Sequence, residues 1–212
     1  MPVVRIANKI CHFAHIPKCG GTSIESYFVK LGASVAFLDR RFLDQSEIMP
    51  WNISSPQHID GLSLSRLFPN TFFDFGFVVV RNPYSRFLSA FKYQMMREKK
   101  IDLKLDINNF INNDLESAAT GMGKYDNHFK SQTSFLLPQL SYKVFKLENG
   151  LMPVKRYIDS NFFDFPIALD IERKNQGIET NDKFAISMQS KNTIRHIYKD
   201  DFENFQYDLT ES

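Results

Sequence analysis

The feature that most constrains the fold is a pair of adjacent glycines between a strand-like and a helix-like segment. Residues 10–16 alternate apolar residues with polar or small ones, as a half-buried strand does. Beyond the glycines, apolar residues recur at helical spacing until Gly32 stops the pattern: Ile24, Tyr27, Phe28 and Leu31. Thr22 and Glu25 have the spacing of a capping box. The pattern predicts a strand that turns sharply into a helix.

The turn itself, residues 15–23, has the composition of an anion-binding loop. Adjacent glycines let backbone N–H groups converge, and a helix N-terminus adds partial positive charge there. Lys18 contributes a full charge, and Thr22 and Ser23 contribute hydroxyl donors. The loop is not a Walker A motif, because Lys18 precedes the glycines instead of following the last one. We expect a cradle for a phosphate or sulfate group; the alternative is an ordinary turn in which Lys18 is only a solvated charge.

A second strand-to-helix unit follows at residues 75–91. Residues 75–80 form a nearly continuous apolar run, which is typical of a strand buried on both faces of a parallel sheet. Asn82 is a good N-cap and Pro83 a good first helical residue. The next apolar residues form one helical stripe: Phe87, Leu88, Phe91 and Met95.

Arg81, Ser85 and Ser89 are spaced by four residues and therefore share one edge of the helix start. A guanidinium group and hydroxyls on one edge suit a phosphate. The alternative is a surface charge beside surface serines, but an arginine at a helix N-terminus is unfavourable unless an anion lies nearby. Two such sites in one chain indicate a ligand with anionic groups at two ends.

These two motifs resemble those of sulfotransferases that use 3′-phosphoadenosine 5′-phosphosulfate (PAPS). Residues 15–24 are similar to the family's 5′-phosphosulfate loop, and residues 81–91 are similar to its 3′-phosphate motif. The closest likeness is to the carbohydrate-type branch (sulfotransferase family 2), which includes heparan sulfate 2-O- and chondroitin 4-O-sulfotransferases and bacterial relatives. The resemblance implies cofactor binding by Lys18, Cys19, Gly20, Gly21, Thr22, Ser23, Arg81 and Ser89. Cys19 departs from the commoner threonine, at a position expected to contribute mainly its backbone N–H.

Weaker similarities occur at residues 126–132, 143–148 and 198–203. Residues 143–147 read as a further core strand, and residues 105–117 and 193–205 as helices. Residues 118–126, with Gly121 and Gly123, are expected to form a flexible loop. We predict a single domain over residues 1–212: a three-layer, P-loop-like α/β fold with a central parallel sheet and helices on both faces. Ligands in such sheets lie at the carboxyl ends of strands, where both motifs fall.

Composition excludes several other classes. The net charge of +2 is too small to indicate a nucleic-acid partner. Cys11 and Cys19 form neither a metal motif nor a disulfide framework, and no Asp-rich segment suits Mg²⁺, so no metal site is expected. The first residues include Arg5 and Lys9, which argues against a signal peptide or membrane span. We therefore expect a cytoplasmic protein, like bacterial members of the family.

The resemblance implies transfer of the sulfuryl group of PAPS to an acceptor hydroxyl, on a carbohydrate or glycoconjugate, with 3′,5′-bisphosphoadenosine as product. Lys18 would then neutralise charge on the bridging oxygen. The place of His58 between the two motifs resembles that of the catalytic histidine in the heparan sulfate 2-O- branch, which implies a general base. His128 is the second candidate, Asp60 a third, and His15 is expected to pack beneath the loop.

Two other classes of function stay open on the residues alone. One is a nucleotide-binding, P-loop-like phosphotransferase, which needs a Walker-type lysine and a Mg²⁺-binding acid. The other is a non-catalytic nucleotide sensor that keeps the cradle without a base.

Overall fold

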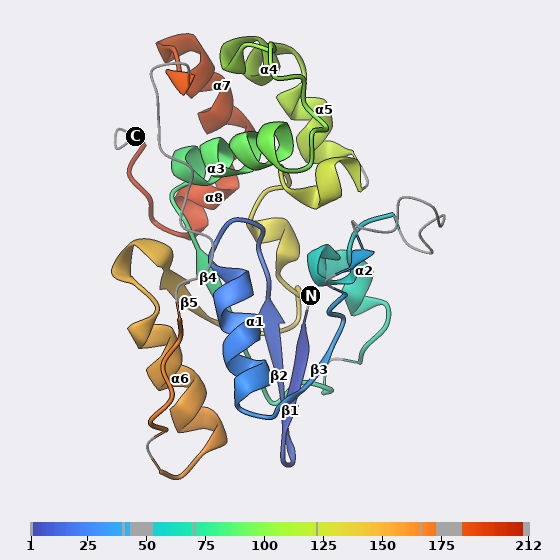
Figure 1. The fold of residues 1–212 in the computed structure, drawn as a ribbon, viewed down its shortest axis with the longest axis vertical. Coiled ribbons are helices and arrows are strands. Elements are labelled where there is room, and N and C mark those ends of the chain that lie inside the picture. The colour runs from blue at the N-terminus through green and yellow to red at the C-terminus, as the bar shows by residue number, and fades with distance from the viewer. Residues whose placement is uncertain are drawn as a thin grey trace.

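The computed structural model describes residues 2–39, 41–42, 53–69, 71–121, 123–165, 167–172 and 184–209. Its centre is a five-stranded sheet in the order β3-β1-β2-β4-β5. The strands are β1 (Val3–Ile6), β2 (Lys9–Ala14), β3 (Ser34–Ala36), β4 (Phe75–Val80) and β5 (Tyr142–Lys146). Figure 1 shows the sheet in the lower half of the molecule.

The sheet is mixed, which corrects the expectation of a parallel one. β2, β4 and β5 run parallel, whereas β1 pairs antiparallel with both β2 and β3. Ile6 faces Lys9 in the register, so only two residues connect β1 to β2. Ala7 adopts a φ of 50° in this turn, at a position where glycine or asparagine is usual. Because position 7 is an alanine, the sequence did not predict a turn there, and β1 was not expected.

Eight α-helices lie in the described part of the chain. They are α1 (Gly21–Lys30), α2 (Gly61–Ser65), α3 (Pro83–Met96), α4 (Ile107–Asn113), α5 (Leu115–Thr120), α6 (Met152–Phe162), α7 (Met188–Ile197) and α8 (Lys199–Asn204). The single helices expected over residues 105–117 and 193–205 are each divided into two. The chain bends at Asp114 in the first case and at Tyr198 in the second.

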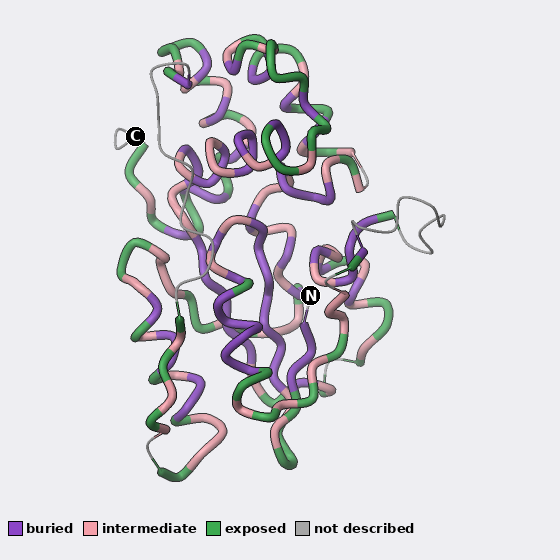
Figure 2. Tube along the Cα trace, viewed as in Figure 1, coloured by how far each residue is buried: buried purple, intermediate pink, exposed green. Residues whose placement is uncertain are grey.

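The two faces of the sheet are covered differently (Figure 2). Phe77 and Val79 of β4 pack on one side with residues of α1 and α6. Val78 and Val80 point to the other side, where α2, loop residues and Phe205 cover them. The longer helices therefore lie on one face, and short elements cover the other.

A separate group of helices, α3, α4, α5, α7 and α8, forms the upper half of the molecule in Figure 1. These helices share their own aromatic-rich core, which includes Phe91, Phe110 and Phe202. Among the described residues, no helix is long and apolar enough to cross a membrane.

The two predicted motifs follow adjacent parallel strands. Ala14 at the end of β2 pairs with Val78 near the end of β4. Because both strands end at the same edge of the sheet, the segments after them lie side by side. The fold thus brings together residues 15–23 and 81–89.

Candidate functional site

The turn after β2 forms the expected strand-to-helix loop. Gly20 has a φ of 82° and is the N-cap of α1, so this position favours glycine. Lys18 also has a positive φ, of 69°. The first N–H groups of a helix have no acceptor within it, and here they open toward the loop. Thr22 is exposed at this end of α1, whereas Ser23 is buried.

The predicted capping box is wrong. No side chain caps α1, and Glu25 instead lies 2.6 Å from Nδ1 of His15. His15 is buried under the loop, as expected: a Cβ added to Gly21 would lie 1.9 Å from its Nε2. Burial lowers the pKa of His15, while Glu25 opposes this shift.

The second motif begins α3 in the predicted way. The side chain of Asn82 accepts the N–H groups of Tyr84 and Ser85, and Pro83 opens the helix. Arg81 donates from Nε to Oγ of Ser85 at 3.0 Å, which turns the guanidinium along the helix start. Ser89 lies one turn further along α3 and is half-buried.

Gln132, which the sequence analysis did not select, joins the two motifs. Its Oε1 accepts the N–H of Arg81 at 2.9 Å and the thiol of Cys19 at 3.5 Å. Its Nε2 donates to the carbonyl of Arg81 at 2.8 Å. Its own N–H donates to Asp201 at 2.8 Å. The Cys19 side chain is thus a buried link, and its backbone N–H donates to the carbonyl of Ile16 at 3.3 Å. The weak similarities at 126–132 and 198–203 were the available signal.

Lys18 and Arg81 place two cations near one another. Burial lowers the pKa of Lys18 to about 8, and Arg81 adds to this effect. The Nζ of Lys18 lies 3.9 Å from the centre of the Tyr93 ring. Lys18 is therefore partly buried instead of fully solvated, and with Arg81 nearby the two side chains can together bind an anion.

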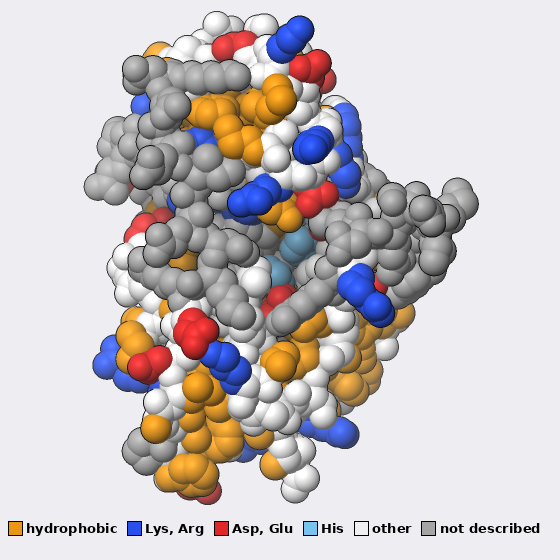
Figure 3. Space-filling view, in the orientation of Figure 1, with side chains coloured by type: hydrophobic (Ala, Val, Ile, Leu, Met, Phe, Trp, Pro, Cys, Tyr) orange, Lys and Arg blue, Asp and Glu red, His pale blue; other side chains and the backbone are white. Residues whose placement is uncertain are grey.

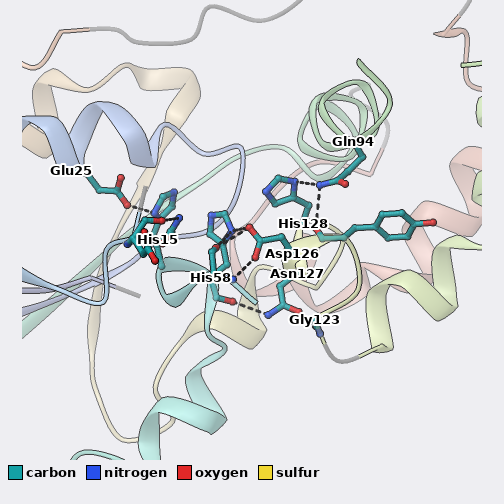
Figure 4. Close-up of polar contacts among 12 residues, drawn as sticks. His15, Glu25, His58, Gln94, Gly123, Asp126, Asn127 and His128 are labelled. Atoms are coloured by element: carbon teal, nitrogen blue, oxygen red, sulfur yellow. Dashed lines mark hydrogen bonds and ion pairs between the residues drawn. The ribbon is translucent and has the colours of Figure 1, made fainter. Parts of the chain in front are cut away.

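Three histidines form a buried group beside this loop (Figure 4). The His58 ring lies 5.0 Å from that of His15 and 5.1 Å from that of His128. Nδ1 of His58 lies 2.6 Å from Oδ2 of Asp126. Ser55 donates to the same carboxylate through its N–H at 2.6 Å and its hydroxyl at 2.8 Å. Burial opposes ionisation of Asp126, but His58 and these donors outweigh it and hold the pKa of Asp126 well below its usual range.

His128 has a different partner. Its Nδ1 lies 2.7 Å from Nε2 of Gln94, and the same Nε2 donates to the carbonyl of Tyr125 at 3.2 Å. Because a carbonyl only accepts, the amide nitrogen of Gln94 donates to it, and Nδ1 of His128 accepts from the same NH₂ group. Burial and the neighbouring His58 lower the pKa of His128 well below its ordinary value.

The segment before His128 has an unusual backbone. Tyr125, Asp126 and Asn127 have φ angles of 52°, 53° and 60°, directly after Gly123 and Lys124. Left-handed backbone costs about 1–2 kcal/mol at each non-glycine residue. Hydrogen bonds hold residues 123–127, which we call the left-handed turn. Residues 118–120 belong to α5, so the loop expected over residues 118–126 is wrong in this part.

The carboxylates near the histidines already have partners. Asp60 caps α2 by accepting the N–H of Ser63 at 2.8 Å, and it pairs with Lys130 at 3.2 Å. His58, Asp126 and His128 present metal-ligand atoms within 4.8 Å of one another. Both oxygens of Asp126 accept hydrogen bonds from Ser55 or His58, so we interpret the cluster as a hydrogen-bonding network. Figure 3 shows histidine side chains at the bottom of a hollow in this face of the molecule.

A sequence model described as the sulfotransferase family matches residues 7–208 of this chain. No curated protein and no solved structure matches it significantly.

Proposed function

The chain belongs to the sulfotransferase family, and on this premise we propose that it uses PAPS to sulfate a hydroxyl group of a carbohydrate or glycoconjugate. The observation that carries the proposal is that the two predicted anion-binding motifs lie next to each other. They follow adjacent strands, Gln132 bonds to both, and they bring Lys18 close to Arg81. A P-loop-like character of the β2–α1 unit is part of the same proposal.

The residues present fit a donor with anionic groups at two ends. The lowered pKa of Lys18 reflects burial and the nearby Arg81, and the charge of an anion bound between them would offset both effects. The first N–H groups of α1 and Lys18 would hold the phosphosulfate, and Arg81 and Ser89 the 3′-phosphate. When bound, PAPS supplies the sulfuryl group and leaves as 3′,5′-bisphosphoadenosine. Lys18 would stabilise negative charge on the phosphate side of the breaking bond.

His58 is the general base in this proposal. It has the largest exposed fraction of the three clustered histidines, at 8% against 6% for His15 and 3% for His128. His128 accepts a hydrogen bond from Gln94 at Nδ1, so its neutral ring carries hydrogen on Nε2 and offers no free acceptor nitrogen. Nε2 of His15 packs beneath Gly21. Asp60 is engaged by Ser63 and Lys130.

Two measurements test the proposed function. Calorimetry without added metal should show binding of PAPS and 3′,5′-bisphosphoadenosine and much weaker binding of ATP. Labelled PAPS should transfer its sulfuryl group to at least one member of an oligosaccharide panel. His58→Gln should keep donor affinity but lower turnover roughly 10²- to 10⁴-fold, as loss of a general base does.

The outcomes separate the alternatives. Equal or tighter binding of ATP would favour a phosphotransferase. Donor binding without transfer to any acceptor, in wild type and variant alike, would favour a nucleotide sensor. If His128→Gln loses turnover while His58→Gln keeps it, the base is His128.

A further inference from the structure

We propose that the left-handed turn, residues 123–127, is a positioning device for His58: Asp126 holds its ring with hydrogen on Nδ1 and a free Nε2, and Asn127 holds its backbone. The inference deepens the proposed function, because it rests on His58 being the base. Asp126 and Asn127 are positioning residues in this scheme and touch no reacting atom.

The hydrogen bonds of Asp126 determine where the proton of His58 lies. The N–H of Ser55 donates to Oδ1, and its hydroxyl donates to Oδ2. An ionised carboxylate only accepts, so the short contact between Oδ2 and His58 requires a proton on Nδ1. In the neutral ring Nε2 then carries a lone pair, which is the form a general base needs.

Asn127 holds the same residue from its backbone side. Its Nδ2 donates to the carbonyl of His58 at 2.8 Å, and its Oδ1 accepts the N–H of Gly123 at 3.1 Å. Consecutive side chains diverge in a regular helix or strand. Here two consecutive side chains reach one residue, and both belong to the left-handed turn.

The turn is anchored at its other end in the helical half of the molecule. The carbonyl of Tyr125 accepts from Gln94 of α3, and its ring packs edge-on against Phe110 and Phe129. A strained backbone persists only where its surroundings over-determine it, and such strain gathers at functional sites. The turn therefore connects His58 to the helical core, and these contacts stabilise its left-handed backbone.

Two other histidines lie against the His58 ring. His128 approaches it from the segment after the turn, and His15 with its partner Glu25 approaches it from the cradle loop. Glu25 pairs with His15, whereas Asp126 is bonded to the His58 ring itself. Asp126 is thus the group whose replacement tests the proposal.

Asp126→Asn makes a sharp test, because Ser55 dictates how the new amide must lie. The fixed N–H of Ser55 requires an oxygen at the Oδ1 position. The amide NH₂ then falls at the Oδ2 position and faces Nδ1 of His58. The Ser55 hydroxyl lies 3.0 Å from the same nitrogen and can also donate to it, so Nδ1 becomes an acceptor. The substitution should move the proton of the neutral ring from Nδ1 to Nε2 with almost no change in shape.

Long-range nitrogen–proton NMR of the imidazole rings, on isotope-labelled protein without ligands, reports which ring nitrogen of His58 carries the hydrogen. The His58 signals are assigned by their loss in His58→Gln. Wild-type His58 should show hydrogen on Nδ1 in its neutral form, and Asp126→Asn should show it on Nε2. A wild-type ring with hydrogen on Nε2 would overturn the proposal, even if the variant fails to fold.

Kinetics supply the second readout. Asp126→Asn should lower kcat roughly 10²-fold or more, with KM for PAPS changed less than about threefold. Adding His58→Gln to Asp126→Asn should cause little further loss, because the two residues act as a unit. Additive losses would mean that Asp126 supports the fold independently of His58, and would overturn the proposal.

Asp159→Asn is the matched control. Asp159 is also buried, and it accepts from Tyr27 at 2.6 Å and Lys155 at 2.7 Å, but it lies on α6. Its replacement should lower Tm without moving the proton of His58. The expected change of tautomer in a protein that transfers no sulfuryl group would sustain the positioning role and reject the proposed function, so the two failures are distinguishable.

Discussion

The imidazole of His15 lies directly beneath Gly21, so close that a Cβ at position 21 would come within 1.9 Å of Nε2. Positions 20 and 21 therefore require glycine for different reasons. Gly20 needs a left-handed backbone, with a φ of 82°, whereas Gly21 needs the absence of a side chain. Glu25 holds the His15 ring in place from the next turn of α1.

Gly21→Ala should destabilise the protein by about 1–3 kcal/mol, because the added methyl overpacks a buried ring. Urea unfolding measures the loss. His15→Ala removes the obstructing ring, so the double variant His15→Ala/Gly21→Ala should be less unstable than the sum of the two single variants. Strict additivity would show that the two residues do not compete for the same space.

Lys18→Ala should lower kcat roughly 10²-fold or more, since one charge-stabilising group is lost from the transition state. Affinity for PAPS should fall less, because the N–H groups of α1 and Arg81 remain. Steady-state kinetics with labelled PAPS checks both values. Near wild-type turnover would remove Lys18 from the mechanism.

The affinity for 3′,5′-bisphosphoadenosine should depend on pH through Lys18. Burial and Arg81 lower the pKa of Lys18 to about 8, so the ammonium form that attracts the anion is lost as the pH rises above this value. Calorimetry should show affinity falling by up to about tenfold per pH unit above pH 8. Lys18→Arg stays charged and should flatten this dependence; an equally steep decline in that variant would assign it to another group.

Arg81→Ala should weaken binding of 3′,5′-bisphosphoadenosine by about 2 kcal/mol, or about 30-fold, which is the usual cost of a lost charge-assisted partner. Binding of 5′-AMP, which lacks the 3′-phosphate, should change little. Arg66 is exposed at the end of α2, and Arg66→Ala serves as a control that should change neither affinity. Equal losses for both nucleotides would mean that Arg81 supports the fold instead of binding the phosphate.

The protein should lose stability in mild acid because of two buried histidines. Burial lowers the pKa of His12 and of His128 well below the ordinary value of about 6.5. Below that pH the unfolded chain binds more protons than the native one, so the free energy of unfolding falls as the pH falls. We expect a loss of about 3 kcal/mol between pH 6.5 and pH 5 from the two residues together.

Urea unfolding across this range checks the expectation. His12→Gln and His128→Gln should each remove about 1.5 kcal/mol of this loss, whatever they do to stability at pH 7. His196, which is exposed on α7, supplies the control: His196→Gln should keep the wild-type slope. Unchanged slopes in the first two variants would contradict the prediction.

Several elements were predictable because short segments carry their causes. The apolar run of β4 has the predicted bounds Phe75–Val80, and Asn82 and Pro83 start α3 through contacts with their nearest neighbours. The two strand-to-helix turns also identified the family, since their spacing depends on local backbone geometry. The two turns lie at one edge of the sheet because β2 and β4 pair side by side in parallel.

Other elements depend on partners far away in the chain. Glu25 has the spacing of a capping box, but the nearby ring of His15 takes its carboxylate. Gln132 lies 113 residues from Cys19 and 51 from Arg81, and local propensity does not predict that its side chain contacts both.

The left-handed turn shows most clearly where prediction from the sequence ends. Tyr125 disfavours left-handed backbone in isolation, so its local propensity argues against the conformation that the structure adopts. Contacts with Ser55, His58 and the helical core stabilise this conformation. The two strand-to-helix turns and the start of α3 could be predicted from the sequence, because they follow from local backbone geometry. Tertiary structure alone decided which carboxylate faces His58, because that pairing depends on long-range packing.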